Sequence, residues 1–144
     1  MHGSPIRRML AATALGAVVA LEASPAALAW TTRFGHTDAP DRTLRKGCHH
    51  YRYHYVAKPK SDDWLLETWL YDPRGKPRGS GDFLHGSDPK EGHGRFGICR
   101  STVVPGRFTI RARLRWYTPG ALPIDPPVRH QKWFKPSHFR LTRP

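Results

Sequence analysis

The ten residues 107–116 alternate between two kinds of side chain with a period of two. They read Arg-Phe-Thr-Ile-Arg-Ala-Arg-Leu-Arg-Trp and follow the pair Pro105-Gly106, which is typical of a turn. Because successive side chains of an extended strand point to opposite sides, this pattern predicts a strand with one apolar and one cationic face. We expect the even-numbered side chains to be buried between two layers. These are Phe108, Ile110, Ala112, Leu114 and Trp116.

Other short segments also carry strand signals. Tyr51, Tyr53 and Tyr55 alternate with polar residues within 47–56, and aromatic enrichment with period two is typical of strands. Residues 64–71 fit either a strand or a helix that Ser61, Asp62 and Asp63 would cap; we favour the strand because the neighbouring segments are strands. The remaining expected strands are 30–34, 95–102, 106–117 and 138–143, with a brief edge strand at Phe83-Leu84.

Turn and loop chemistry separates these segments. Asp72-Pro73-Arg74-Gly75 is a turn sequence, and 76–94 is rich in Gly, Pro, Asp and Ser, so we expect mostly loop there. Residues 119–127 are too rich in proline for central strand pairing. About seven short strands with frequent turns predict an all-β fold, an immunoglobulin-like antiparallel β-sandwich.

The N-terminus fits a secretory signal peptide. Arg7 and Arg8 precede an apolar run over 9–21, and Ala27-Leu28-Ala29 offers the small-residue pattern of a cleavage site. The run is shorter than the roughly 20 apolar residues of a membrane span, so we expect no span in the mature form. We therefore predict a signal peptide over 1–29, cleaved near Ala29, and one domain over 30–144. Export by the general or by the twin-arginine route remains open.

The two cysteines of the chain, Cys48 and Cys99, predict one disulfide in an exported protein. Closing a loop of about 50 residues would stabilise the fold by roughly 4 kcal/mol. If Tyr51, Tyr53 and Tyr55 face inward, Cys48 faces outward, and the pattern around Cys99 gives the same result. The second and fifth strands of such a sandwich are neighbours, so we expect a cross-strand bond within one sheet.

Two segments resemble a known group of domains. They are Leu70-Tyr71-Asp72-Pro73-Arg74-Gly75 and Val104-Pro105-Gly106-Arg107-Phe108-Thr109-Ile110. The second is similar to the start of the sixth strand in bacterial immunoglobulin-like and PKD-like extracellular domains, and the chain as a whole resembles small secreted sandwich proteins of actinobacteria. This resemblance implies the sandwich fold and brings no catalytic residues. Phe108 stands where the motif usually has tyrosine, so the hydroxyl of a tyrosine corner is missing.

The formal net charge is +13, and the arginine stripe of 107–116 is its densest part. A basic face with interleaved aromatic rings suits anionic polymers, through charge attraction and stacking. We expect partners such as anionic cell-wall polymer, acidic polysaccharide or extracellular DNA. The other interpretation is a solvated sheet face without a ligand. The candidate residues are Arg111, Arg113, Arg115, Arg140, Trp69 and Tyr71.

Histidines are the other group with binding chemistry. His50 and His54 share a face but stand about 13 Å apart along an extended strand, too far to chelate one ion. His49 points the opposite way, so a metal site would need a histidine from another strand. We therefore assign no metal ligands, and the sequence shows no catalytic constellation and no cofactor motif.

These features predict a secreted, non-enzymatic binding or structural module with a basic sheet face. The alternative is a secreted inhibitor or effector that recognises a protein partner through long loops. Residues 119–136 or 76–94 would then make the contact.

Overall fold

The computed structural model describes residues 32–144 and folds them into nine strands and one 3₁₀ turn. The expected signal peptide and residues 30–31 lie outside the described part. Within 32–144, no helix has the length and apolar character needed to cross a membrane. The elements are β1 (Gly35–Asp38), β2 (Arg42–Thr43), β3 (Cys48–Ala57), β4 (Trp64–Tyr71), β5 (Pro77–Leu84), β6 (Glu91–Cys99), η1 (Arg100–Thr102), β7 (Gly106–Thr118), β8 (Val128–Trp133) and β9 (Ser137–Thr142).

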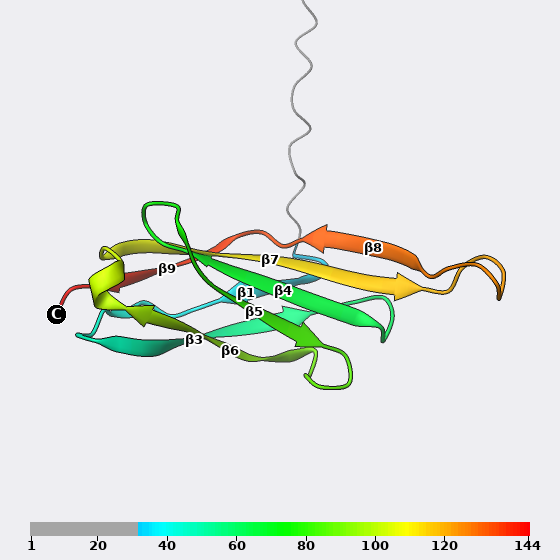
Figure 1. Ribbon diagram of the computed structural model, residues 1–144, viewed down its shortest axis with the longest axis horizontal. Coiled ribbons are helices and arrows are strands. Elements are labelled where there is room, and N and C mark those ends of the chain that lie inside the picture. Colours follow the sequence, from blue (N-terminus) through cyan, green and yellow to red (C-terminus); the bar gives the residue numbers. More distant parts are fainter. Residues whose placement is uncertain (1–31) are drawn as a thin grey trace, which may run out of the picture.

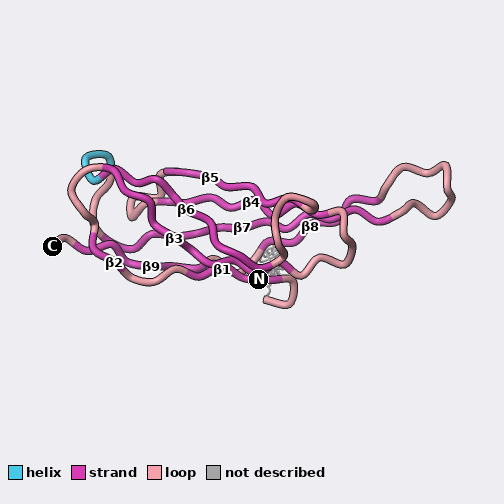
Figure 2. The backbone as a smooth tube through the Cα atoms, turned by 90° about the horizontal axis from the view of Figure 1, so that it is seen from below, coloured by secondary structure: helices cyan, strands magenta, loops and turns pink. Residues whose placement is uncertain are grey.

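Two sheets face each other as a sandwich (Figure 1). The small sheet has the order β1-β3-β6, and the large sheet has the order β2-β9-β7-β4-β5, with β8 also paired to β7 (Figure 2). Every pairing is antiparallel except that of β2 with β9. The strand β7 lies between β4 and β9 while β3 pairs with β6, which is the immunoglobulin-like arrangement. The predicted all-β sandwich is therefore confirmed.

The strand β7 supplies the centre of the core. Its even-numbered residues from 108 to 116 are at most 3% exposed. The tyrosines of β3 belong to the same core and are at most 4% exposed. The period-two prediction for both strands is therefore confirmed. Phe108, without a hydroxyl to place, stacks on Phe139 of β9 with ring centroids 5.6 Å apart.

The disulfide joins neighbouring strands of the small sheet. Cys48 and Cys99 are register partners at the end of the β3–β6 pair and are bonded to each other across 51 positions of sequence. Cys48 is exposed and Cys99 half-buried, and both lie outside the core. The expected cross-strand bond within one sheet, in place of an inter-sheet bond through the core, is confirmed.

The expectation of a loop over most of 76–94 is wrong. The strand β5 begins at Pro77 and pairs with β4 along its whole length, and β6 begins at Glu91, before the expected start at 95. The glycines in β5 suggested a loop, but they make room for neighbours. A Cβ at Gly81 would lie 3.0 Å from the Tyr53 hydroxyl, and one at Gly79 would lie 3.3 Å from the Phe96 ring. Glycine in a strand often marks such a close approach.

Other segments also differ from the expectation. Residues 32–34 form a bend and turn before β1, and 100–102 form η1 in place of the end of a strand. The strand β8 was not predicted; it pairs with the C-terminal part of β7, while β9 pairs with the N-terminal part. The hairpin that joins β7 to β8 projects beyond the sandwich (Figure 1).

Candidate functional site

The odd-numbered side chains of β7 lie on the outer face of the large sheet. Register pairs Arg111 with Trp69 and Arg113 with Glu67 of β4, and Arg113 also with Trp133 of β8. All of these side chains are half-buried. We define the arginine–aromatic face as Glu67, Trp69, Tyr71, Arg111, Arg113, Arg115 and Trp133. Five of the six sequence-predicted residues, all but Arg140, are thus neighbours.

Glu67 holds two of the three arginines. Its carboxylate accepts hydrogen bonds from Nε and Nη2 of Arg113, at 2.9 and 3.1 Å, and from Nε of Arg115 at 2.9 Å. Burial raises the pKa of Glu67, but these charged donors outweigh it and leave the pKa below its ordinary value. The carboxylate is therefore ionised at neutral pH and offsets one of the three positive charges.

Aromatic rings contact the guanidinium groups of Arg111 and Arg113. The Trp69 and Trp133 rings lie 5.5 Å apart by their centroids. Arg113 Cζ lies 5.4 Å from the Trp69 ring centre and 5.2 Å from that of Trp133. Arg111 Cζ lies 5.4 Å from the Trp133 ring centre and 5.8 Å from that of Tyr71. Trp133 therefore packs between two cations, at distances where cation–π attraction stabilises the pair.

Arg140 lies apart from this group. Arg140 is on β9 and is the register partner of Arg107, which lies at the N-terminal end of β7. Both side chains are exposed. Arg111 is four positions beyond Arg107 along the strand, which is about 13 Å. Arg140 therefore extends the basic surface along the sheet and does not belong to the arginine–aromatic face.

Trp133 is the residue that sequence reasoning missed. It lies in a segment with proline on both sides, at 127 and 136, that we expected to be loop. Residues 128–133 read Val-Arg-His-Gln-Lys-Trp and show no alternation of apolar and polar side chains, so no local pattern predicts the strand. Its partner Arg113 is 20 positions away, so only the β7–β8 register reveals the contact.

The arginine–aromatic face combines planar rings with cations held at fixed positions. Sugar rings and nucleobases stack on aromatic side chains, and guanidinium groups bind carboxylates, sulfates and phosphates with directed hydrogen bonds. Because Glu67 and the rings already hold the arginines in place, these side chains lose little conformational entropy when a ligand binds.

The histidines lie on other surfaces. His49 contacts the Lys46 carbonyl at 2.7 Å, and His50 faces Gly97 across the β3–β6 pair. His54 lies beside His36 and Asp38 of β1. Of the described chain, 32–144, these three residues are the group whose side-chain donor atoms converge on one point, all within 4.8 Å of one another.

Comparison of the chain with protein families, with curated proteins and with solved structures finds no match.

Proposed function

We propose that this protein is a secreted, non-enzymatic binding module that adheres to anionic extracellular polymers through its arginine–aromatic face. The observation that carries the proposal is the packing of Trp133 between Arg111 and Arg113. If the face were only solvated, its arginines could point freely into water, and no indole ring would be required to hold them in place. This combination suits a polymer with both rings to stack and anions to pair.

Two further features support this function. The expected signal peptide directs the chain out of the cell, and a disulfide is typical of proteins in oxidising compartments. The net charge is +13 for the whole sequence and +12 once Arg7, Arg8 and Glu22 are lost with the signal peptide, and it attracts polyanions over a distance. Suitable polymers are anionic cell-wall polymer, acidic polysaccharide and extracellular DNA.

The test is retention of the purified protein on heparin-agarose. The variant Arg111→Ser/Arg113→Ser removes the two cations beside Trp133 and leaves the Glu67–Arg115 pair in place. The control Arg52→Ser/Arg95→Ser removes two exposed cations from the small sheet. We expect the first variant to lose about tenfold in affinity, as for two lost ionic contacts, and the control to change by less than about twofold. Equal losses in both variants would mean attraction by net charge alone, and no loss in either would refute the proposal.

Two single substitutions separate charge from stacking. Glu67→Gln removes the internal anion of the face and should strengthen heparin binding. Trp133→Leu keeps every charge and should weaken binding to single-stranded DNA by about 1–3 kcal/mol, the usual contribution of one stacked base. Affinities from fluorescence titration at two salt concentrations give both results.

A second candidate function is favoured by the β7–β8 hairpin. Its tip exposes Leu122 and Ile124, with Ile124 at 89% exposure, and the hairpin projects from the sandwich (Figure 1). From this apolar tip we infer that the protein is an inhibitor or effector and that the hairpin binds a protein partner. Of the two expected loops, only 119–127 remains, since 76–94 is largely strand and 128–133 is β8.

Salt separates the two functions. Polymer binding should collapse between low and moderate salt, whereas an apolar protein contact should persist. In a pull-down from culture supernatant at moderate salt, Leu122→Ser/Ile124→Ser should lose any partner that the wild type retains. Unchanged retention would exclude the hairpin tip as the contact.

A further inference from the structure

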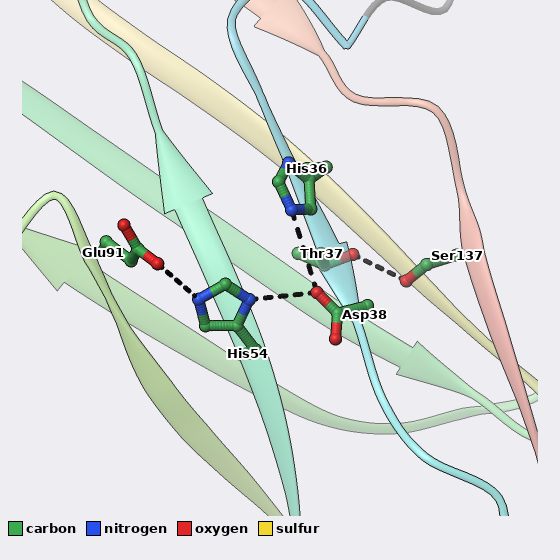
Figure 3. A network of polar contacts seen from close by, with 6 residues as sticks. All are labelled: His36, Thr37, Asp38, His54, Glu91 and Ser137. Carbon is green, nitrogen blue, oxygen red and sulfur yellow. Dashed lines mark hydrogen bonds and ion pairs between the residues drawn. The ribbon is translucent and has the colours of Figure 1, made fainter.

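A second cluster of binding side chains lies on the outer face of the small sheet, on the side of the sandwich away from the arginine–aromatic face. Three strands contribute to it: His36 and Asp38 come from β1, His54 from β3, and Glu91 from β6 (Figure 3). His54 is the register partner of Asp38 on one side and of His93 on the other. The histidine from another strand that sequence spacing alone could not supply is therefore present.

The donor atoms are nearly at coordination distance. Asp38 Oδ1 lies 3.0 Å from Nδ1 of His54 and 3.8 Å from Nε2 of His36. Tetrahedral zinc with bonds of 2.0–2.1 Å places its ligand atoms about 3.3 Å apart. Small side-chain rotations are thus enough to bring all three atoms around one ion. His36 and Asp38 are two residues apart on one strand, so both project from the same face.

Glu91 orients His54 from behind. Its Oε1 lies 3.1 Å from Nε2 of His54, on the side of the ring opposite Asp38 (Figure 3). Histidines that bind metals usually donate their second ring N–H to a carboxylate or carbonyl, which fixes the ring and its tautomer. An ion that displaces the hydrogen between Nδ1 and Asp38 would leave this second hydrogen bond intact.

The backbone around the cluster is held in place from the core side. Thr37 lies between the two β1 ligands with its side chain pointing inward, is 4% exposed, and its Oγ1 lies 2.7 Å from Oγ of Ser137 in β9 (Figure 3). This contact and the β1–β3 register set the positions of His36 and Asp38 before any ion arrives. The ring of His93 lies 5.3 Å from that of His54, near enough to supply a fourth ligand after rotation.

We propose that His36, Asp38 and His54 bind one divalent transition-metal ion, with Glu91 as a positioning residue. Two imidazoles and one carboxylate suit zinc, copper or nickel and disfavour the oxygen-seeking ions calcium and magnesium. His36 and Asp38 are exposed, and a hollow lined by Asp38, His54, His93, Arg42 and Arg52 adjoins the cluster, so an ion can reach it from solvent. The site is on the other sheet from the proposed polymer-binding face, and its existence is independent of that function.

The test is calorimetric titration of the purified, untagged protein with Zn²⁺ alone. We expect one saturable site in the wild type and at least a tenfold weaker affinity in His36→Ala and in His54→Ala. The control is His50→Ala, which removes an exposed histidine from the same face of β3 and should leave the affinity within about twofold. Absence of saturable binding, or equal affinity in all three variants, would overturn the proposal.

Two more measurements guard against a loss of fold in the variants. Zn²⁺ should raise the Tm of the wild type and of His50→Ala but not of His54→Ala, because only an ion that binds the native state stabilises it. Glu91→Ala should weaken Zn²⁺ binding by about 10–100-fold, and Glu91→Gln should recover part of this loss, because its amide oxygen can accept the His54 N–H. Equal affinities for Glu91→Ala and the wild type would remove Glu91 from the site.

Discussion

At the scale of single residues, glycine opposite tyrosine allows β3 and β6 to enclose large rings. Gly92 is the register partner of Tyr55, and Gly94 is that of Tyr53. The Tyr53 hydroxyl lies 2.7 Å from Oγ1 of Thr68 in β4, so it joins the two sheets. Thr68 Oγ1 donates its own hydrogen to the Gly81 carbonyl, so Tyr53 is the donor in the inter-sheet bond. Burial raises the pKa of Tyr53 to about 12, which keeps this donor protonated.

Gly94→Ala is expected to destabilise the protein. The added Cβ would lie 2.3 Å from Cζ and from the hydroxyl oxygen of Tyr53, which the core holds in place. The free energy of unfolding should fall by about 2–3 kcal/mol, as for other overpacked cores, in urea denaturation. The control is Gly97→Ala on the same strand, where the nearest atoms belong to His50 at 3.9 Å. A similar loss in both variants would contradict this role of Gly94.

At the scale of elements, one carboxylate organises the turn between β4 and β5. Asp72 Oδ1 accepts hydrogen bonds from the backbone N–H groups of Arg74 and Lys76, both at 2.9 Å, and Oδ2 accepts one from Nε of Arg78 at 2.8 Å. Gly75 completes the turn with a φ of +75°, which few other residues tolerate. Burial raises the pKa of Asp72, but the hydrogen bonds of its three partners outweigh it and leave the pKa lowered.

Asp72 is expected to make the stability of the protein depend on acid pH. A carboxylate with a lowered pKa in the folded state stabilises that state fully above its unfolded pKa of about 3.9 and loses the effect as the pH falls through the folded value. Asp72→Ala should reduce the free energy of unfolding by about 3 kcal/mol at pH 7, because it leaves the turn donors without a partner.

The difference between this variant and the wild type should shrink toward pH 2. Urea titrations at pH 7 and at acid pH measure it. The control is Asp62→Ala, which removes only the exposed pair with Lys90. A difference between wild type and Asp72→Ala that is independent of pH would contradict the role of the ionised carboxylate.

At the scale of the whole molecule, the disulfide links two strands that are distant in sequence and adjacent in space. Cys48 begins β3 and Cys99 ends β6, so the bond closes the span that contains β3, β4, β5 and β6. Closing a loop of this length stabilises the fold mainly because it lowers the entropy of the unfolded chain. The bond therefore stabilises the sandwich as a unit.

Cys48→Ser/Cys99→Ser should lower the free energy of unfolding by about 4 kcal/mol, the value for a loop of this length. Guanidinium denaturation of the double variant measures the loss, and reduction of the wild type should reproduce it. Because the bond lies outside the core, near-ultraviolet circular dichroism should show intact aromatic packing before unfolding. A loss below about 1 kcal/mol would mean that the unfolded chain is already compact.

The arginine–aromatic face shows which parts of a site a sequence contains. Arg111, Arg113 and Arg115 share a face because of local geometry, so their alignment follows from the sequence. The positions of Trp69 and Tyr71 beside them depended on placing β4 next to β7, which the expected sandwich supplied. Trp133 entered through an unexpected strand, and the pairing of Glu67 with two arginines depends on register.

Features with a local pattern could be predicted from the amino-acid order alone: the alternations of β7 and β3 and the outward direction of both cysteines. A two-residue period indicates which side of a strand each residue faces, whatever the strand pairs with. Contacts between distant segments make the glycine-rich β5 and the proline-flanked β8 strands, and they bring His36 and Asp38 beside His54. Strand pairing depends on hydrogen bonds and side-chain space supplied by distant residues, and this information is not present in any short window of the chain.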